Sequence, residues 1–444
     1  MPAPGLPSSG VAALNSPIPM ALIVHKYGGT SMGSTERIRN VAKRVAKWAR
    51  AGHQMVVVPS AMSGETNRLL GLAKELQPAR ADDAVLRELD MLASTGEQVS
   101  VGLLALALQA EGVPAVSFAG WQVPVRTNSA YTKARIESID DVRVRKELDA
   151  GKVVIITGFQ GIDDLGHITT LGRGGSDTSA VAVAAALKAA ECLIYTDVDG
   201  VYTTDPRVVP EARRLSTVSF EEMLEMASLG AKVLMIRAVE LAMAQKVRLL
   251  VRSSFDDPDA PQVAPDGSPG VPGTLVCDED EIMEKQIVSG VTLAKAEAKI
   301  TLRAVKDNPG VAAAIFGTLA DQGIVVDMIV QNIADDGATT DITFTVPDSE
   351  YDRAMKALQG AGDKIEYGRI TGAKGGAKVS GVGVGMRSHA GVASSMFKAL
   401  ADKGINIQLI TTSEIKTSVL IDEQYAELAV RALHTYYGLD KKDE

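Results

Sequence analysis

The last third of the chain contains the same segment twice. GVAAAIFGTLADQGIVVDMI, beginning at Gly310, aligns without gaps on GVASSMFKALADKGINIQLI, beginning at Gly391, and ten of the twenty positions are identical. Each copy predicts a helix, a Gly-Ile turn and a strand, with one strand before it, another after it and a final helix. A unit of this size buries little apolar surface alone. We therefore expect the two βαββ units to pair with each other or across a dimer.

The first two thirds of the chain alternate short β-rich runs with helical stretches. Such alternation predicts an α/β layered sheet with mainly parallel strands. Ligands of these sheets bind outside the carboxyl ends of the strands. Each run is followed by a loop of Gly, Ser, Thr and Asp, so the loops should converge on one site. The runs are ALIVHKYGGTS, QMVVVPSAMSGET, VPAVSFAG, KVVIITGFQGID and ECLIYTDVDGVYTTDP.

Composition limits the partners and the compartment. The net charge of −9 argues against nucleic acid or an anionic membrane as the main partner. Cys192 and Cys277 share no metal-binding or redox spacing, which favours a reducing cytoplasm. We expect no apolar run that approaches the ~20 residues needed to span a bilayer.

Changes in composition along the sequence suggest domain boundaries. Residues 1–19 carry no charge and several prolines, and they are expected to be a disordered extension. A catalytic domain is expected over 20–252, followed by a connecting segment over 253–297 that starts rich in Pro, Asp and Gly. The repeats then give domains at 298–372 and 373–444. The sequence leaves open whether Met283 also starts a separate regulatory chain.

Two glycine-rich loops carry a cation each. KYGGTS begins at Lys26, and GRGGSD contains Arg173 just before a predicted helix. Glycine lets the backbone approach a ligand closely, and the amide groups at a helix start attract an anion. An arginine can hold a carboxylate with two parallel hydrogen bonds. Together the loops suit a polyphosphate opposite an acid substrate. Neither matches the Walker A or GxGxxG spacing, and each alone is more typical of a plain strand–helix turn than of a ligand site.

The order of several motifs closely resembles that of the aspartate kinases, in the amino-acid-kinase family. The resemblance covers Met20 to about Gly438, and the doubled unit is similar to the paired ACT domains of that family. It implies an amino-acid-kinase-type layered sheet followed by two ACT-like α+β (ferredoxin-like) domains. It also implies ATP-dependent phosphorylation of the side-chain carboxylate of L-aspartate to 4-phospho-L-aspartate, the first step toward lysine, threonine and methionine. The motifs are KYGGTS, VVVPSAMSGET, STGEQVS, GFQG, TTLGRGGSDTSA, YTDVDGVYTTDPR and GAKVL.

This resemblance gives individual residues a role. Lys26 should meet the transferring phosphoryl group, Lys232 should lie on the leaving-group side, and Asp177 should orient the lysines or meet the substrate ammonium group. On its own, Lys232 would be a solvated helix lysine and Asp177 a helix cap. The resemblance implies that the amino-acid pocket comprises Thr66, Glu97 for the α-ammonium group, Phe159, Arg173 for the α-carboxylate, Gly174, Gly175 and Ser176.

ATP is the implied cosubstrate, and Mg²⁺ is expected to arrive with it. We expect no dedicated protein metal site, because the phosphates supply much of the coordination. Without the resemblance, Glu97 would be an ordinary surface glutamate. The implied nucleotide site comprises Lys26, Tyr27, Gly28, Gly29, Ser60, Thr196, Asp197, Tyr202 and Arg207.

The ACT pair implies feedback control by lysine, threonine or both, and a homodimer or higher homo-oligomer formed through these domains. Val325 in the first repeat stands where Asn406 stands in the second, so the two repeats need not offer equivalent sites. The implied effector residues are Asp307, Asp327, Gln331, Asn406, Ile407, Ser413 and Glu414.

Two other functions fit parts of the sequence. A kinase for N-acetylglutamate or glutamate would share the fold but should lack STGEQVS and the ACT pair. A catalytically silent amino-acid sensor should have lost a charged residue of the site. Lys26, Glu97, Arg173 and Asp177 are all present, which favours the enzyme.

Overall fold

The computed structural model describes residues 21–441 except 77–81, 230–232, 258–272, 283–285, 335–337, 363–364 and 390. The predicted extension 1–19, Lys232 and Met283 lie outside the described residues. The described chain divides into two compact units. The first holds residues 21–201, 214–227 and 233–282, and the second holds residues 202–213, 228–229 and 286–441.

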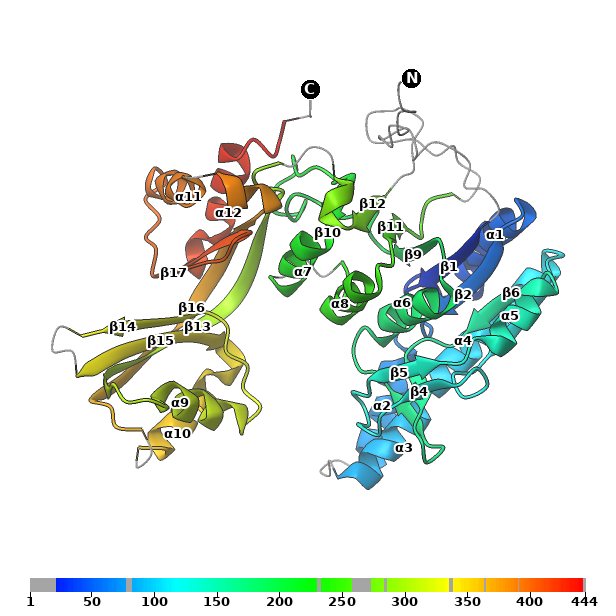
Figure 1. Cartoon of the computed structure of the whole chain (residues 1–444), viewed down its shortest axis with the longest axis horizontal. Coiled ribbons are helices and arrows are strands. Elements are labelled where there is room, and N and C mark those ends of the chain that lie inside the picture. The colour runs from blue at the N-terminus through cyan, green and yellow to red at the C-terminus, as the bar shows by residue number, and fades with distance from the viewer. Residues whose placement is uncertain are drawn as a thin grey trace, which may run out of the picture. The chain divides into compact units, whose positions relative to one another are not determined.

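The first unit is built on an eight-stranded sheet whose neighbouring strands are mostly parallel, as the alternation predicts (Figure 1). One pair, β11 with β12, is antiparallel. The same unit also contains a four-stranded sheet, with the strand order β5-β4-β7-β8. In order across the large sheet, the strands are β10 (Thr217–Ser219), β12 (Thr274–Cys277), β11 (Leu249–Ser253), β9 (Glu191–Thr196), β1 (Leu22–Tyr27), β2 (Gln54–Pro59), β6 (Val153–Ile156) and β3 (Ala115–Phe118); the small sheet has β4 (Val125–Thr127), β5 (Ile136–Ile139), β7 (Gln160–Ile162) and β8 (Ile168–Thr170).

Strand β12 falls inside the segment that the sequence suggests is only a connection, residues 253–297. Its four residues follow a Pro- and Gly-rich stretch, and they are buried between β10 and β11. A strand this short has too few residues to give a periodic signal, so its place is set by pairing with strands far away in the sequence.

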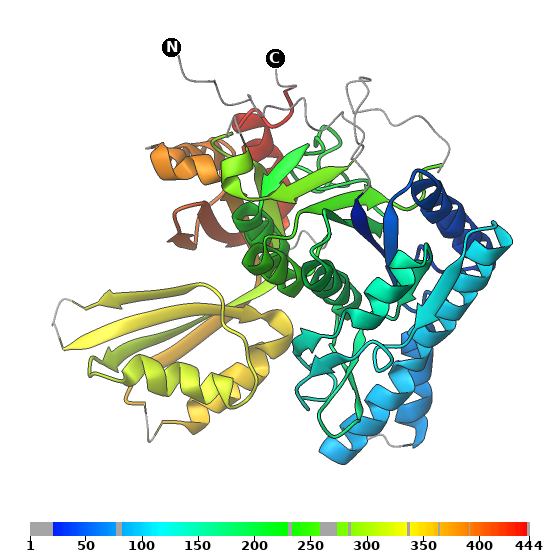
Figure 2. The ribbon, with the colours of Figure 1, turned by 45° about the vertical axis from the view of Figure 1, so that its right-hand side comes forward.

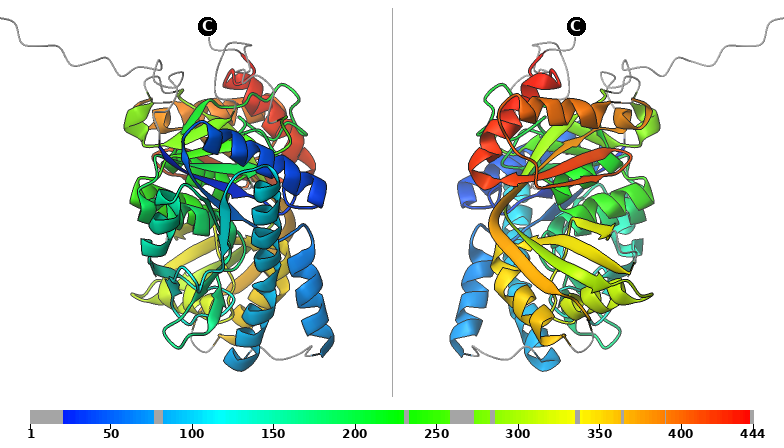
Figure 3. Two further views of the ribbon diagram at one scale, coloured as in Figure 1. Left: turned by 90° about the vertical axis from the view of Figure 1, so that its right-hand side faces the viewer. Right: turned by 90° about the vertical axis from the view of Figure 1, so that its left-hand side faces the viewer.

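Helices cover both faces of the large sheet (Figures 1 and 3). One core cluster joins β1 to α1 and α4 on one face, while α6 packs over β1, β2 and β9 and against α8. Successive residues of a strand point to opposite faces. Ile23 and Tyr27 belong to the α1/α4 core, so Lys26 points toward α6. The helices of this unit are α1 (Thr35–Arg50), α2 (Glu65–Leu76), α3 (Asp83–Ala93), α4 (Thr95–Ala110), α5 (Val142–Asp149), α6 (Gly175–Leu187), α7 (Phe220–Ser228) and α8 (Ile236–Gln245).

One helical stretch of the first unit is longer and more apolar than the sequence pattern predicts. Residues 83–110 form one run that would be long and apolar enough to cross a membrane by length and composition alone. Half of its most apolar window is buried inside the fold, and Leu104 and Leu108 belong to the α1/α4 core. Helix burial in this layered core accounts for the apolar composition.

The second unit confirms the predicted repeats. Each copy has the order strand, helix, two strands and helix, and β13 pairs with β16 so that the copies share one six-stranded sheet. Figure 2 shows α9 and α10 on one face of this sheet, where Ile315 and Leu358 join the core. The expected pairing of the two units is therefore met within one chain. The elements are β13 (Gly290–Lys306), α9 (Val311–Ala320), β14 (Ile329–Ile333), β15 (Thr339–Pro347), α10 (Tyr351–Gly360), β16 (Arg369–Val382), α11 (Val392–Ala401), β17 (Leu409–Thr412), β18 (Lys416–Asp422) and α12 (Ala426–Tyr436).

A short segment of the catalytic part of the sequence packs with the second unit. Residues 202–213 include Thr203, whose Oγ1 lies 2.9 Å from Nε2 of His434 on α12. Arg213 Nε donates to the carbonyl of Leu439 at 2.8 Å. Both Thr203 and His434 are buried, so this segment is held firmly by the repeat region.

Candidate active site

A buried ion pair stands at the centre of the predicted site. Lys26 Nζ, from β1, lies 2.6 Å from Asp177 Oδ1, from the first turn of α6. Both side chains are about nine-tenths buried. Lys26 belongs to the strand itself, where the alternation of side chains aims it at α6. The pair brings together two of the three residues predicted to be catalytic.

The glycine turn after β1 opens the backbone beside this lysine. The Gly28 N–H donates to the Tyr195 carbonyl at 3.2 Å, which ties the turn to the carboxyl end of β9. A Cβ at Gly28 would lie 3.5 Å from Lys26 Nζ. Gly29 is also crowded, because a Cβ there would meet the Ala61 carbonyl at 3.2 Å. Small residues therefore keep the surroundings of the ammonium group open to a ligand.

Glu97 is buried with half of its carboxylate unused. Its Oε1 accepts a hydrogen bond of 3.0 Å from the Ala61 N–H, in the loop after β2. Its Oε2 is buried and has no partner among the described residues. Burial raises the pKa of Glu97 to about 7. A buried carboxylate oxygen without a partner is costly, so a cationic ligand would be a strong stabiliser here.

The glycines around Arg173 are required by close packing. Gly174 has a φ of 71° and precedes α6 as its N-cap. A Cβ there would come within 1.9 Å of Met235 Cγ, so only glycine fits. The Arg173 side chain itself is exposed, with no ion pair or hydrogen bond in the described part of the chain. The loop thus presents a free guanidinium group four residues before Asp177.

The loop after β6 packs against the start of α6. Phe159 has a φ of 68°, and its N–H donates to Ser179 Oγ at 3.0 Å. A Cβ at Gly158 would meet Ser176 Oγ at 2.7 Å, and one at Gly175 would meet the Phe159 ring at 2.9 Å. The structure therefore brings Phe159, Gly175 and Ser176 together.

The remaining predicted residues divide into three groups. Ser60 follows β2, and its N–H donates to the Tyr27 carbonyl at 2.9 Å, while Thr196 ends β9 and donates to Asp197 at 3.1 Å. Thr66 lies in the first turn of α2, next to Glu65, whose Cγ would be 3.6 Å from a Cβ at Gly96. The other two described nucleotide residues, Tyr202 and Arg207, fall in segment 202–213, and Lys232 lies outside the described residues.

Two residues near the site carry no sequence signal, and a third belongs to a motif that assigns it no role. Arg237 of α8 donates to the carbonyls of Leu171 at 3.0 Å and Ala134 at 2.8 Å, which fixes the strand end before the Arg173 loop. Met235 covers Gly174. Ser31, inside KYGGTS, is buried with an Oγ that has no partner in the described chain. Contacts to backbone carbonyls and glycines depend on tertiary packing, so no spacing reveals them.

Comparison with known proteins agrees with this geometry. The amino acid kinase family model matches residues 21–253, and an ACT domain model matches residues 303–361 and 379–437. An aspartate kinase of Pseudomonas fluorescens is 59% identical over 95% of this chain and 98% of its own length. The chain belongs to the aspartate kinases of the amino acid kinase family. An aspartokinase of Pseudomonas aeruginosa is 58% identical over the same shares.

Solved structures of this family share the whole architecture. Aspartokinase III of Escherichia coli in complex with aspartate and ADP is 28% identical, with a TM-score of 0.73 over 94% of this chain and 99% of that one. The complex of that enzyme with lysine and aspartate gives 27% identity and a TM-score of 0.72 over 93% and 99%. The predicted family and fold class are confirmed. The alternative of a silent sensor is not favoured, since these full-length relatives are named as kinases.

Proposed function

We propose that this kinase transfers the γ-phosphoryl group of ATP to the side-chain carboxylate of L-aspartate. One observation carries the proposal: Glu97, in the first turn of α4, has an unpaired buried carboxylate oxygen, and Arg173, in the loop before α6, has a free guanidinium group. An α-amino acid offers one ammonium and one α-carboxylate to match them. The relative with aspartate and ADP bound supports the same substrates.

The chemistry needs positioning and positive charge more than it needs a base. A carboxylate is already ionised at neutral pH, so one side-chain oxygen can attack the γ-phosphorus directly. As the new P–O bond forms, the bond to the bridging oxygen breaks and ADP leaves. Lys26 neutralises charge on the phosphoryl group, and the lack of a side chain at Gly28, where a Cβ would lie 3.5 Å from Lys26 Nζ, leaves room for its oxygens. Asp177 fixes the direction of the lysine.

The nucleotide is assigned to the carboxyl ends of β1, β2 and β9, and Tyr202 and Arg207 remain nucleotide residues implied by the family resemblance. Mg²⁺ bound with the nucleotide would supply positive charge that neutralises the phosphates. Among the described residues no cluster of three His, Cys, Asp or Glu side chains could hold a metal ion. Lys232 remains the proposed residue on the leaving-group side.

A panel of acids tests the substrate assignment. Release of ADP would be measured with L-aspartate, L-glutamate, N-acetyl-L-glutamate and N-acetyl-L-aspartate. We expect turnover with L-aspartate alone. Blocking the amino group should abolish activity, because it removes the charge that Glu97 binds. Equal rates with N-acetyl-L-glutamate would assign the chain to another acid kinase.

Arg173→Lys is expected to raise the aspartate KM about tenfold while the ATP KM stays near that of the parent. Lysine keeps the charge but cannot make two parallel hydrogen bonds to a carboxylate. The measurement is steady-state saturation with each substrate. Arg126→Lys, an exposed arginine on β4, is the matched control. Unchanged aspartate saturation in Arg173→Lys would remove this residue from the substrate site.

Feedback control is assigned to the paired ACT domains, with lysine, threonine or both as effectors and a homodimer or higher oligomer as the assembly. The lysine complex of the Escherichia coli relative supports lysine. Asp307 is exposed between β13 and α9, and Gln331 is exposed on β14. Asp327 contacts buried Lys378 of β16, so it is already engaged across the two repeats. The other effector candidates are Asn406, Ile407, Ser413 and Glu414.

Asp307→Ala and Gln331→Ala are each expected to raise the half-inhibitory effector concentration about tenfold, with uninhibited turnover nearly unchanged. Both remove a polar group from the proposed effector site without touching the catalytic unit. Dose–response curves with lysine, threonine and their mixture give the readout. Asp321→Ala, at the other end of α9, is the control. Identical curves for all four proteins would place the effector elsewhere.

The compartment and the domain limits follow from the same proposal. Cys192 and Cys277 are both free and buried, and burial raises the pKa of Cys277 to about 11, which suits a cytoplasmic enzyme with unreactive thiols. We propose 20–252 as the main part of the kinase domain, to which β12 adds a strand, and 298–372 and 373–444 as the ACT domains, the first of which is preceded by the start of β13 at Gly290.

A further inference from the structure

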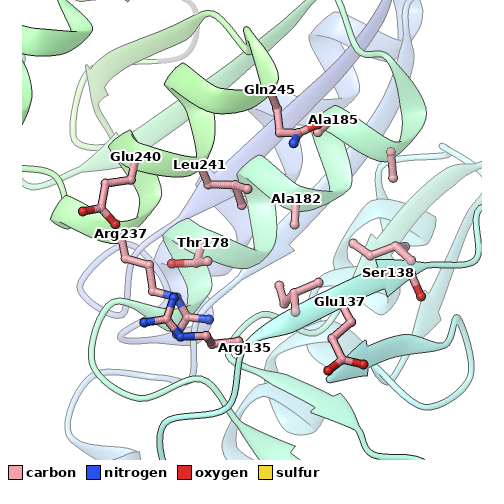
Figure 4. Close-up of a pocket in the computed structure, with 13 residues that line it drawn as sticks. Arg135, Glu137, Ser138, Thr178, Ala182, Ala185, Arg237, Glu240, Leu241 and Gln245 are labelled. Carbon is pink, nitrogen blue, oxygen red and sulfur yellow. The ribbon is translucent and has the colours of Figure 1, made fainter. Parts of the chain in front are cut away.

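A second cavity lies in the kinase unit among β5, α6 and α8. It has a volume of about 500 Å³ and is lined by none of the residues assigned to aspartate or ATP (Figure 4). Thr178, Ala182 and Ala185 contribute one wall from α6, and Leu241 contributes another from α8. Thr178 directly follows Asp177 in the chain, so the cavity and the active site share the first turns of one helix.

Two arginines meet in this cavity. Figure 4 shows the guanidinium groups of Arg135 and Arg237 together at one end. Burial lowers the pKa of Arg237, and the positive charge of Arg135 lowers it further. Arg237 donates only to backbone carbonyls, and Arg135 has no side-chain partner in the described ranges. Two like charges held together without an ion pair attract an anion.

Two glutamates also line the cavity, and neither neutralises the positive charge of the two arginines. The charge of Glu240 acts on Arg237 less strongly than that of Arg135 does. Figure 4 shows the Glu137 and Glu240 carboxylates directed away from the two guanidinium groups. Neither glutamate forms an ion pair with a described residue. The end of the cavity at the arginines therefore stays positive.

We propose that this cavity binds a small aliphatic carboxylate, distinct from the substrate aspartate. Arg135 and Arg237 would hold the carboxylate, and the alkyl part would lie against Ala182, Ala185 and Leu241. The planar donors of arginine can bind either a carboxylate or a phosphate. The apolar wall favours the carboxylate, because it has a hydrocarbon part to bury and inorganic phosphate has none.

A ligand in the cavity would affect the Arg173 loop through Arg237. Arg237 holds the Leu171 carbonyl at the end of the strand that leads into Arg173. A carboxylate bound to Arg237 would fix this guanidinium group further and hold the loop in one position. This consequence rests on the proposed role of Arg173, whereas binding in the cavity does not.

Saturation-transfer difference NMR with butyrate tests the site on the full chain. The parent is compared with Arg135→Gln, with Arg126→Gln as a matched surface control, and with Arg173→Gln. Arg135 makes no side-chain contact that folding needs, and thermal melting checks this. We expect saturable binding in the parent, at least about fivefold weaker binding in Arg135→Gln, and unchanged binding in the other two variants.

Each other outcome overturns the proposal. Equal binding in Arg135→Gln would place butyrate elsewhere. Loss of binding in Arg173→Gln would mean that butyrate occupies only the proposed aspartate site. Displacement of butyrate by inorganic phosphate at lower concentration than butyrate itself requires would make the cavity a phosphate site. None of these readouts depends on kinase activity, so failure here leaves the proposed function standing.

Discussion

Lys26→Ala is expected to lower the turnover number on the order of 10²–10³-fold, as the loss of a preorganised charge on a transferring group does. The side chain is buried, pairs with Asp177 at 2.6 Å and faces the glycine turn. Michaelis constants should change much less, because the charge acts mainly on the transition state. Steady-state kinetics with ATP and aspartate measure the effect.

This substitution also affects folding, and the design must separate the two effects. Removing Lys26 leaves the Asp177 carboxylate buried without its partner, which costs about 3–5 kcal/mol in comparable pairs. Lys26→Ala combined with Asp177→Asn removes that charge and should recover thermal stability without recovering turnover. Lys43→Ala, an exposed lysine on α1, is the control. Turnover within threefold of the parent in Lys26→Ala would show that the lysine is not catalytic.

Glu97→Gln is expected to lower kcat/KM for aspartate on the order of 10–10²-fold at pH 8, the loss expected for a buried hydrogen bond to a charged group. Glutamine keeps the shape and can still accept from the Ala61 N–H. In the parent, kcat/KM should fall as the pH drops through about 7, where burial places the pKa of Glu97. The variant should lack this pH dependence.

At pH 8 the stability of Glu97→Gln should rise although its kcat/KM falls. Burial raises the pKa of Glu97 in the folded chain above its unfolded value, so the folded state holds the proton more tightly. The parent therefore loses stability as the pH rises from the unfolded pKa to about 7, and levels off above it. Glu97→Gln should melt higher than the parent at pH 8 and nearly equally at pH 4.5. A variant that is both less stable and fully active at pH 8 would contradict the assignment.

Much of the fold and part of the site could be predicted from local sequence. Alternation along LIVHKY puts Lys26 on the face away from the α1 core, and the repeat predicts the order of elements in each ACT unit. The repeat leaves open whether the units pair with each other or across a dimer, and the structure pairs them within one chain through β13 and β16. Strand β12 could not be predicted, because four residues after a Pro-rich stretch become a strand only through long-range pairing.

The finer construction of the site depends on contacts that distant segments make. The unpaired oxygen of Glu97 exists because α4 packs against the loop after β2, and nothing in STGEQVS reveals it. Arg237 supports the Arg173 loop by donating to a backbone carbonyl. Every residue type has such a carbonyl, so the sequence gives no sign of this contact. Segment 202–213 begins within the motif YTDVDGVYTTDPR, which the family resemblance assigns to the nucleotide. It nevertheless packs with the second unit through Thr203 and His434.

The position of the new phosphoryl bond is the sharpest test of the proposed active site. The kinase would be run with ATP and L-aspartate in the presence of hydroxylamine, which converts an acyl phosphate to a hydroxamate, and mass spectrometry would locate the product. If Arg173 and Glu97 hold the α-carboxylate and the α-ammonium group, only the side-chain hydroxamate should form, and Lys26→Ala should form it on the order of 10²–10³-fold more slowly. An α-hydroxamate, or no ATP-dependent hydroxamate at all, would contradict the proposed site.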